Sequence, residues 1–151
     1  MFAAFLIGVI AGLRTMTAPA AVSWAVKLGA LKPRHAALAF LGSTFTLWVL
    51  TLLALAELVV DQLRTTSDRR APVPFGARMA SGAVSGAGIA ASGGSLAGGL
   101  VVGAAGALTG TLAGYAFRAR LAATFGRDRP AAFVEDAIAI GGALVILAWL
   151  E

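Results

Sequence analysis

The longest uncharged stretch of the chain runs from Met79 to Phe117 and is bounded by Arg78 and Arg118. As one helix at about 1.5 Å per residue it would be roughly 58 Å long, nearly twice the ~30 Å hydrocarbon core of a bilayer. The stretch is therefore predicted to fold back on itself. Ser92-Gly93-Gly94-Ser95 is the best candidate for the turn, because glycine adopts the positive φ angles that tight turns need. This pattern predicts a hairpin of two helices, over about 76–92 and 95–117.

Glycines recur within this hairpin at helical spacing, in the small-xxx-small pattern by which membrane helices approach each other closely. Close packing of such a glycine zipper is the first interpretation, and a thinned pore wall or a hinge is the alternative. The glycines that we expect to lie in helix contacts are Gly82, Gly86, Gly99, Gly103, Gly106, Gly110 and Gly114.

Three further apolar segments flank this hairpin. The first, over about 2–30, is interrupted by Arg14 and by Pro19, which disfavours helix at the residue before it. It is predicted to be one broken span, with a re-entrant hairpin of two half-helices as the alternative. The second and the last, over about 36–60 and 130–150, are each long enough to cross a bilayer.

Together these segments predict an all-α, polytopic transmembrane bundle in which residues 1–151 form one domain with about five spans. The chain is 59% hydrophobic and only 13% charged, with a mean hydropathy of +0.87, far more apolar than a soluble domain. Five spans would place the termini on opposite sides of the membrane. They also allow an inverted repeat, in which the first two spans correspond to the last two around a central helix.

The distribution of charge predicts the orientation. The formal net charge is +5, but the basic residues gather at the ends of apolar segments, so anionic lipid head groups are the expected partner and nucleic acid is not. Under the positive-inside rule the arginine-rich loops are cytoplasmic, which places the N-terminus inside and the C-terminus outside the inner membrane. The arginines on that side are Arg64, Arg69, Arg70, Arg78, Arg118, Arg120, Arg127 and Arg129, against Lys27, Lys32 and Arg34 on the other.

Arg14 is the ionisable residue that most needs a partner. It lies about 18 Å along the first span from Phe2, near the bilayer midplane, where insertion scales assign about 2.5 to 3.5 kcal/mol to an arginine. Glu135 and Asp136 lie about 7 to 9 Å inside the last span and are the preferred counter-ions. Glu57 is expected near the inner interface, too far from Arg14.

Several readings of these charges stay open. The bridge could only fix the register of helices, could belong to a polar path for an ion, a proton or a small solute, or could bind lipid phosphate. Asp61 is expected to pair with Arg64 at the interface. The residues expected along a path are Arg14, Thr15, Thr17, Glu135 and Asp136, with Glu57, Asp61 and Arg78 as secondary candidates.

Signals for an enzyme are weak. The chain has no cysteine and one histidine, His35, so neither a thiolate site nor a histidine-pair metal site is expected, and no cofactor is expected. The segment 86–91 imitates part of a dinucleotide-binding loop, but it lies in an uncharged transmembrane stretch with no strand before it. We therefore expect a protein that is not an enzyme.

Short motifs in the chain resemble a family of small bacterial integral membrane proteins, domain of unknown function 4126. The motifs are Gly12-Leu13-Arg14-Thr15 followed by Pro19, Glu57-Leu58-x-x-Asp61, and glycine- and alanine-rich helices ending in Glu135-Asp136. The resemblance covers essentially the whole chain. It implies a membrane protein with no established activity and assigns no role to any residue.

The leading functional hypothesis is a small bacterial inner-membrane channel or transporter. Its polar site would be built at the break in the first span, and an arginine at the midplane favours an anionic or proton-coupled solute. The competing hypothesis is a scaffold or accessory subunit without transport, in which the same charges only hold helices together. Because so small a bundle has little interior and its glycine faces suit subunit contact, a homo-oligomer is expected.

Overall fold

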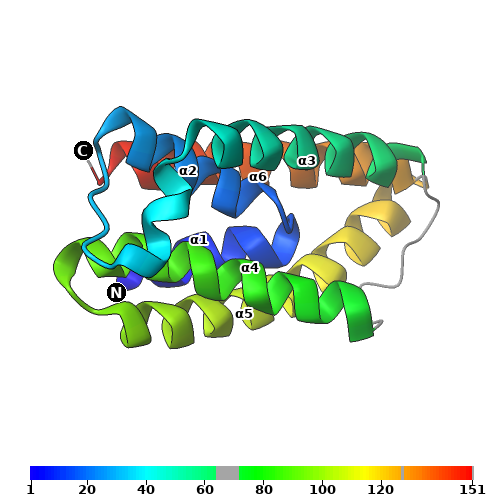
Figure 1. Ribbon diagram of the computed structural model, residues 1–151. Helices are drawn as coiled ribbons and strands as arrows, with labels where there is room; N and C mark the ends of the chain where they lie inside the picture. The colour runs from blue at the N-terminus through cyan, green and yellow to red at the C-terminus, as the bar shows by residue number, and fades with distance from the viewer. Residues whose placement is uncertain (64–71, 127, 151) are drawn as a thin grey trace.

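The computed structural model describes residues 1–63, 72–126 and 128–150, and there the chain is all-α (Figure 1). Long helices lie side by side, and two shorter helices at the N-terminus are inserted among them. The elements in chain order are α1 (Phe2–Leu13), α2 (Thr17–Leu28), η1 (Ala36–Gly42), α3 (Thr44–Leu63), α4 (Pro72–Ala90), η2 (Ala91–Gly93), α5 (Leu96–Phe125) and α6 (Asp128–Ala148), where η marks a 3-10 helix.

The first two helices run in opposite directions and form a hairpin (Figure 1). At one end of α1 the Met1 side chain lies against Gly98, and beyond α2 the Lys32 N–H donates to Ser92 Oγ at 3.2 Å. Both ends of the hairpin therefore lie beside the turn between α4 and α5, and the tip near Arg14 lies within the bundle. The expected single broken span is wrong, because the segment turns back as a hairpin of two helices, the path that the alternative gives it.

The physical reason lies at the break itself. Arg14 leaves α1 in an extended conformation, with φ −136° and ψ 114°. Pro19 falls in the first turn of α2, where its missing N–H would have no intrahelical partner in any case. Proline here starts a new helix in a new direction, whereas the interpretation of one broken span treats it as a kink.

This hairpin changes the topology. The rings of Phe2 and Trp149 meet edge to face with centroids 6.4 Å apart, so the two termini lie at the same end of the bundle. The expected placement of the termini on opposite sides is therefore wrong. The inverted repeat fails with it, because residues 2–30 turn back whereas α5 is one continuous helix of 30 residues.

Within the described part of the chain, three helices are long and apolar enough to cross a membrane, and they indicate a multi-pass membrane protein. They cover Thr44–Asp61, Leu96–Thr124 and Pro130–Ala148. The expected second span, 36–60, begins later because residues 36–42 form η1 and Ser43 is extended before α3. The helix α4 is not among the three; it carries Arg78 and several serines and glycines in place of larger apolar side chains.

Glycines let α5 approach α1 on one side and α4 on the other. A Cβ added to Gly103 would overlap the carbonyl oxygen of Gly82 in α4, and one added to Gly8 in α1 would overlap the carbonyl oxygen of Gly103. These contacts lie within one chain, which removes the reason for expecting subunit contact at the glycine faces. The remaining predicted glycines lie as follows: Gly86 and Gly99 at the α4–α5 contact, Gly106 and Gly110 at the α1–α5 contact, and Gly114 buried in α5.

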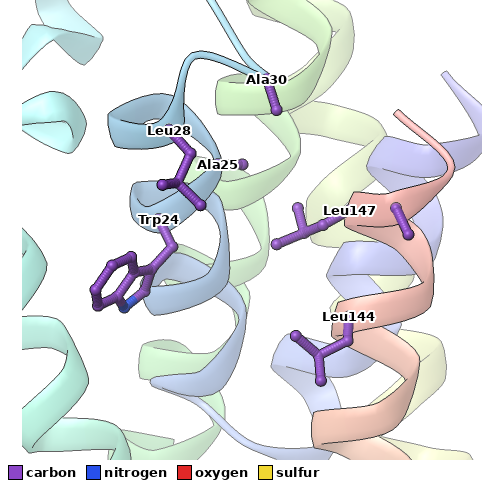
Figure 2. Close-up of a pocket in the computed structure, with 7 residues that line it drawn as sticks. Trp24, Ala25, Leu28, Ala30, Leu144 and Leu147 are labelled. Carbon is purple, nitrogen blue, oxygen red and sulfur yellow. The ribbon is translucent and has the colours of Figure 1, made fainter. Parts of the chain in front are cut away.

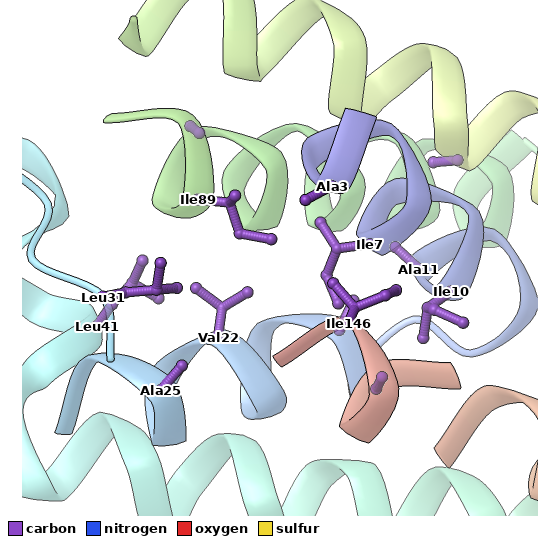
Figure 3. Close-up of a cluster of buried hydrophobic side chains, with 14 of the residues drawn as sticks. Ala3, Ile7, Ile10, Ala11, Val22, Ala25, Leu31, Leu41, Ile89 and Ile146 are labelled. Carbon is purple, nitrogen blue, oxygen red and sulfur yellow. The ribbon is translucent and has the colours of Figure 1, made fainter. Parts of the chain in front are cut away.

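The hydrophobic core fills the space beside the hairpin, toward the end of the bundle that holds both termini (Figure 3). Ile7 of α1, Val22 of α2 and Leu41 of η1 are fully buried there, and Ile89 of α4 and Ile146 of α6 are buried beside them. These apolar side chains hold the outer part of the hairpin. The tip of the hairpin is held by ion pairs and hydrogen bonds.

Candidate functional site at the hairpin tip

Arg14 occupies the tip of the hairpin, and it is completely buried. Its Nη1 forms an ion pair with Asp61 Oδ2 near the end of α3, and its Nη2 forms an ion pair with Asp136 Oδ1 in α6. One side chain therefore links the hairpin to two of the long apolar helices. Asp136, one of the two expected counter-ions, does pair with Arg14, and Asp61 is a second counter-ion.

A second arginine, Arg118 of α5, joins the same group. Its Nη1 lies 3.4 Å from Asp61 Oδ2 and 3.6 Å from Glu135 Oε2. Asp61 is thus shared by two guanidinium groups. The Glu135 side chain is 1% exposed, whereas those of Asp61 and Arg118 are 16% and 14% exposed, so the group is most open around this pair.

The backbone at the end of α1 is satisfied by side chains from two other helices. Carbonyl groups at a helix C-terminus have no intrahelical donor. The Gly12 carbonyl accepts from Arg78 Nη1 at 3.2 Å and from Thr111 Oγ1 at 3.3 Å, and the Thr15 carbonyl accepts from Ser81 Oγ. Helices α4 and α5 thereby hold the turn in place.

The start of α2 is capped from α3. The N–H groups of Thr15 and Met16 each donate to the Glu57 carboxylate at 2.8 Å, one to each oxygen. A carboxylate at a helix N-terminus is favoured by the helix dipole and by charge-assisted hydrogen bonds. The cap fixes the direction in which α2 leaves the turn.

We refer to these acidic and basic side chains as the charged cluster: Arg14, Glu57, Asp61, Arg78, Arg118, Glu135 and Asp136. Several polar atoms in and near it are buried without a hydrogen-bond partner in the described part of the chain, among them Arg14 Nε, Thr17 Oγ1 and Ser85 Oγ. Leaving such a group unsatisfied costs about 1 to 3 kcal/mol. Native proteins usually satisfy buried polar groups with protein atoms or with ordered water.

The structure places the charged residues that the sequence singled out for a polar path at the hairpin tip. Thr15 takes part through its backbone, Thr17 lies in the first turn of α2, and the secondary candidates Glu57, Asp61 and Arg78 lie at the tip as well.

One expectation about the acids was wrong, and another rests on a residue outside the described part of the chain. Glu57 lies beside the tip, because the hairpin brings the tip to the level of the inner ends of α3 and α6. Asp61 pairs with Arg14 and Arg118; its expected partner Arg64 lies outside the described residues.

Sequence reasoning missed Ser81, Thr111 and Arg118 as members of the site. A signal existed for the first, since Arg78, Ser81 and Ser85 recur at helical spacing along one face of α4. Nothing marks Thr111 among the other hydroxyl residues of the apolar segments.

The chemistry available at this site is that of fixed charges and proton-accepting carboxylates. Among residues 1–63, 72–126 and 128–150, no group of three or more histidine, cysteine, aspartate or glutamate side chains could hold a metal ion. The cluster can bind an ion or a hydrogen-bonding solute, and its carboxylates can exchange protons.

Comparison of the chain with protein-family models, with curated proteins and with solved structures gave no match. The resemblance to the family of small bacterial membrane proteins therefore stays an expectation.

Proposed function

We propose that this protein is a small multi-pass transporter or channel of the bacterial inner membrane, in which an ion or small solute passes through the charged cluster. The observation that supports this most is the pair of unsatisfied buried groups at the hairpin tip, Arg14 Nε and Thr17 Oγ1. A passing solute, or the water that accompanies it, would satisfy them.

The form of the hairpin supports the same proposal. Non-helical backbone at membrane depth is tolerated where it is buried in protein or lines a cavity, and transporters build ion and substrate sites from such broken helices. Because Asp61 and Asp136 already neutralise Arg14, a proton-coupled solute fits the cluster better than a free anion.

The arginine-rich end of the bundle is proposed to face the cytoplasm, by the positive-inside rule. Since the termini lie together at the other end, both would then be outside. This orientation replaces the cytoplasmic N-terminus expected from five spans.

A scaffold without transport is the second candidate, and one observation favours it. Arg14 is fully buried between carboxylates from two helices, as in a bridge that locks a bundle together. Such a scaffold would form a homo-oligomer most readily through α3. Only 6% of the residues in the spanning segment of α3 are buried within the chain.

Flux in reconstituted liposomes tests the transport proposal. Wild-type protein should carry protons, followed with an enclosed pH-sensitive dye, or a small solute above the rate of protein-free liposomes. Thr17→Val keeps the shape of the side chain and removes the hydroxyl, so flux should fall while the unfolding temperature stays the same or rises, because an unsatisfied group is lost.

Ser85→Ala is the matched control, because Ser85 Oγ is also buried without a partner but lies more than a helical turn along α4 from Ser81 and Arg78. It should change stability in the same direction and leave flux unchanged. Absence of any proton, monovalent-ion or small-anion flux from folded wild-type protein would overturn transport and favour the scaffold.

A further inference from the structure

A groove lies between α2 and α6, and it begins toward the C-terminal ends of these two helices. Its wide part, about 450 Å³, is lined by Trp24 and Leu28 of α2 and by Leu144 and Leu147 of α6. Figure 2 shows the two leucines of α6 pointing across the gap toward α2. The lining of this part is apolar apart from the indole nitrogen of Trp24.

The groove continues inward along α2. A narrower part of about 170 Å³ shares Trp24 and Leu144 with the wide part and reaches Thr17, with Leu58 of α3 forming another wall. From Leu28 to Thr17 the groove follows α2 for about 16 Å. That length is half of the ~30 Å hydrocarbon core, the depth of one leaflet.

Residues typical of the membrane–water interface lie in the groove or close to its lining along α2. Trp24 donates from Nε1 to Thr51 Oγ1 at 3.1 Å and meets the ring of Trp48 edge to face at 6.1 Å. One turn further along α2, the exposed Lys27 donates to Thr44 Oγ1 at 2.8 Å. Tryptophan rings are enriched at head-group level, and lysine attracts anionic lipid phosphate.

We propose that this groove binds one acyl chain of an anionic phospholipid, with the lipid phosphate at Lys27. The lipid belongs to the leaflet at the end of the bundle that holds both termini. The end of its acyl chain reaches Thr17 of α2 and Ile140 of α6. Ile140 lies one helical turn from Asp136, so the acyl chain covers the side of the charged cluster that faces the lipid. The proposal is independent of transport, since a scaffold would bind the same lipid.

Fluorescence quenching by brominated lipids tests the site. In a variant with Trp48→Phe and Trp149→Phe, Trp24 is the only tryptophan. At equal mole fraction, brominated phosphatidylglycerol should quench Trp24 more than brominated phosphatidylcholine does. The expected preference is about fivefold in apparent affinity, the attraction of one lysine for an anionic surface, and Lys27→Gln should abolish it.

A filling variant tests the groove itself. Ala21→Phe introduces a ring into the narrow part, and Ala105→Phe places the same ring on an exposed face of α5 as the control. Native mass spectrometry of detergent-purified protein should show bound phosphatidylglycerol in wild type and in the control and a loss with Ala21→Phe. Equal quenching by both lipids, or lipid retained in Ala21→Phe, overturns the proposal. So does a chain dimer that shields Trp24 from both lipids.

Discussion

The environment of Arg14 shows how a buried charge constrains its surroundings. Its burial and its need for a carboxylate could be predicted from sequence, because depth along a helix is simple geometry and an isolated charge in lipid is costly. Asp136 was among the candidates for the same reason. The nearness of Glu57 could not be predicted, since the expected depth of Arg14 rests on a single first span that the chain does not form.

Breaking the buried bridge should destabilise the fold strongly. Arg14→Met removes the cation that Asp61 and Asp136 share, so the free energy of unfolding should fall by about 3 to 5 kcal/mol, as for other buried pairs that lose one member. Unfolding by denaturant in micelles measures the change. Adding Asp136→Asn should recover part of the loss, and the coupling should be about 0.5 to 3 kcal/mol.

The exposed Lys27→Met serves as the control for this cycle, with an expected effect below about 1 kcal/mol. If Arg14→Met cost no more than this control, the bridge would not be a determinant of stability.

At the scale of elements, glycine spacing predicts which helix faces pack closely, but it does not predict which helix packs against each face. The repeat in 76–114 predicts small faces on α4 and α5. It does not reveal that α1 fits against α5 through Gly8 and Gly12, because two glycines in a 12-residue helix give no repeat long enough to recognise. The direction of α2 also depends on capping by Glu57, which is 41 residues from Met16 in sequence.

A single methyl group should separate α5 from α1. In Gly106→Ala the new Cβ would overlap the Phe5 carbonyl oxygen, and a backbone atom cannot move aside as a flexible side chain can. The free energy of unfolding in micelles should fall by an amount typical of an overpacked contact, about 1 to 3 kcal/mol.

Gly141→Ala in α6 provides the matched control, because nothing lies within 4 Å of its added Cβ. There the higher helix propensity of alanine should raise stability by about 0.5 to 1 kcal/mol. Equal effects of the two substitutions would contradict the close approach of α1 and α5.

At the scale of the whole molecule, the class of the protein follows from composition, and the topology does not. Arg14 followed by Pro19 is compatible with a kinked span and with a hairpin. The choice depends on whether distant residues can satisfy the freed backbone groups of the turn, and here Arg78, Ser81 and Thr111 do so. Those donors lie more than 60 residues away in sequence, beyond the reach of any local pattern.

The topology can be tested by labelling, since the chain has no cysteine and any introduced one is unique. The variants are Phe2→Cys, Ala123→Cys and His35→Cys. Residue 2 begins α1, residue 35 follows α2, and residue 123 lies near the C-terminal end of α5. Because α1 and α2 form a hairpin, a membrane-impermeant maleimide applied to intact cells should label Cys at 2 and at 35 from the same side. In the orientation proposed from the positive-inside rule that side is the outside, and position 123 should then react only after the membrane is opened. Labelling of 2 and 35 from opposite sides would restore the single broken span, and with it the five-span arrangement that the hairpin replaces.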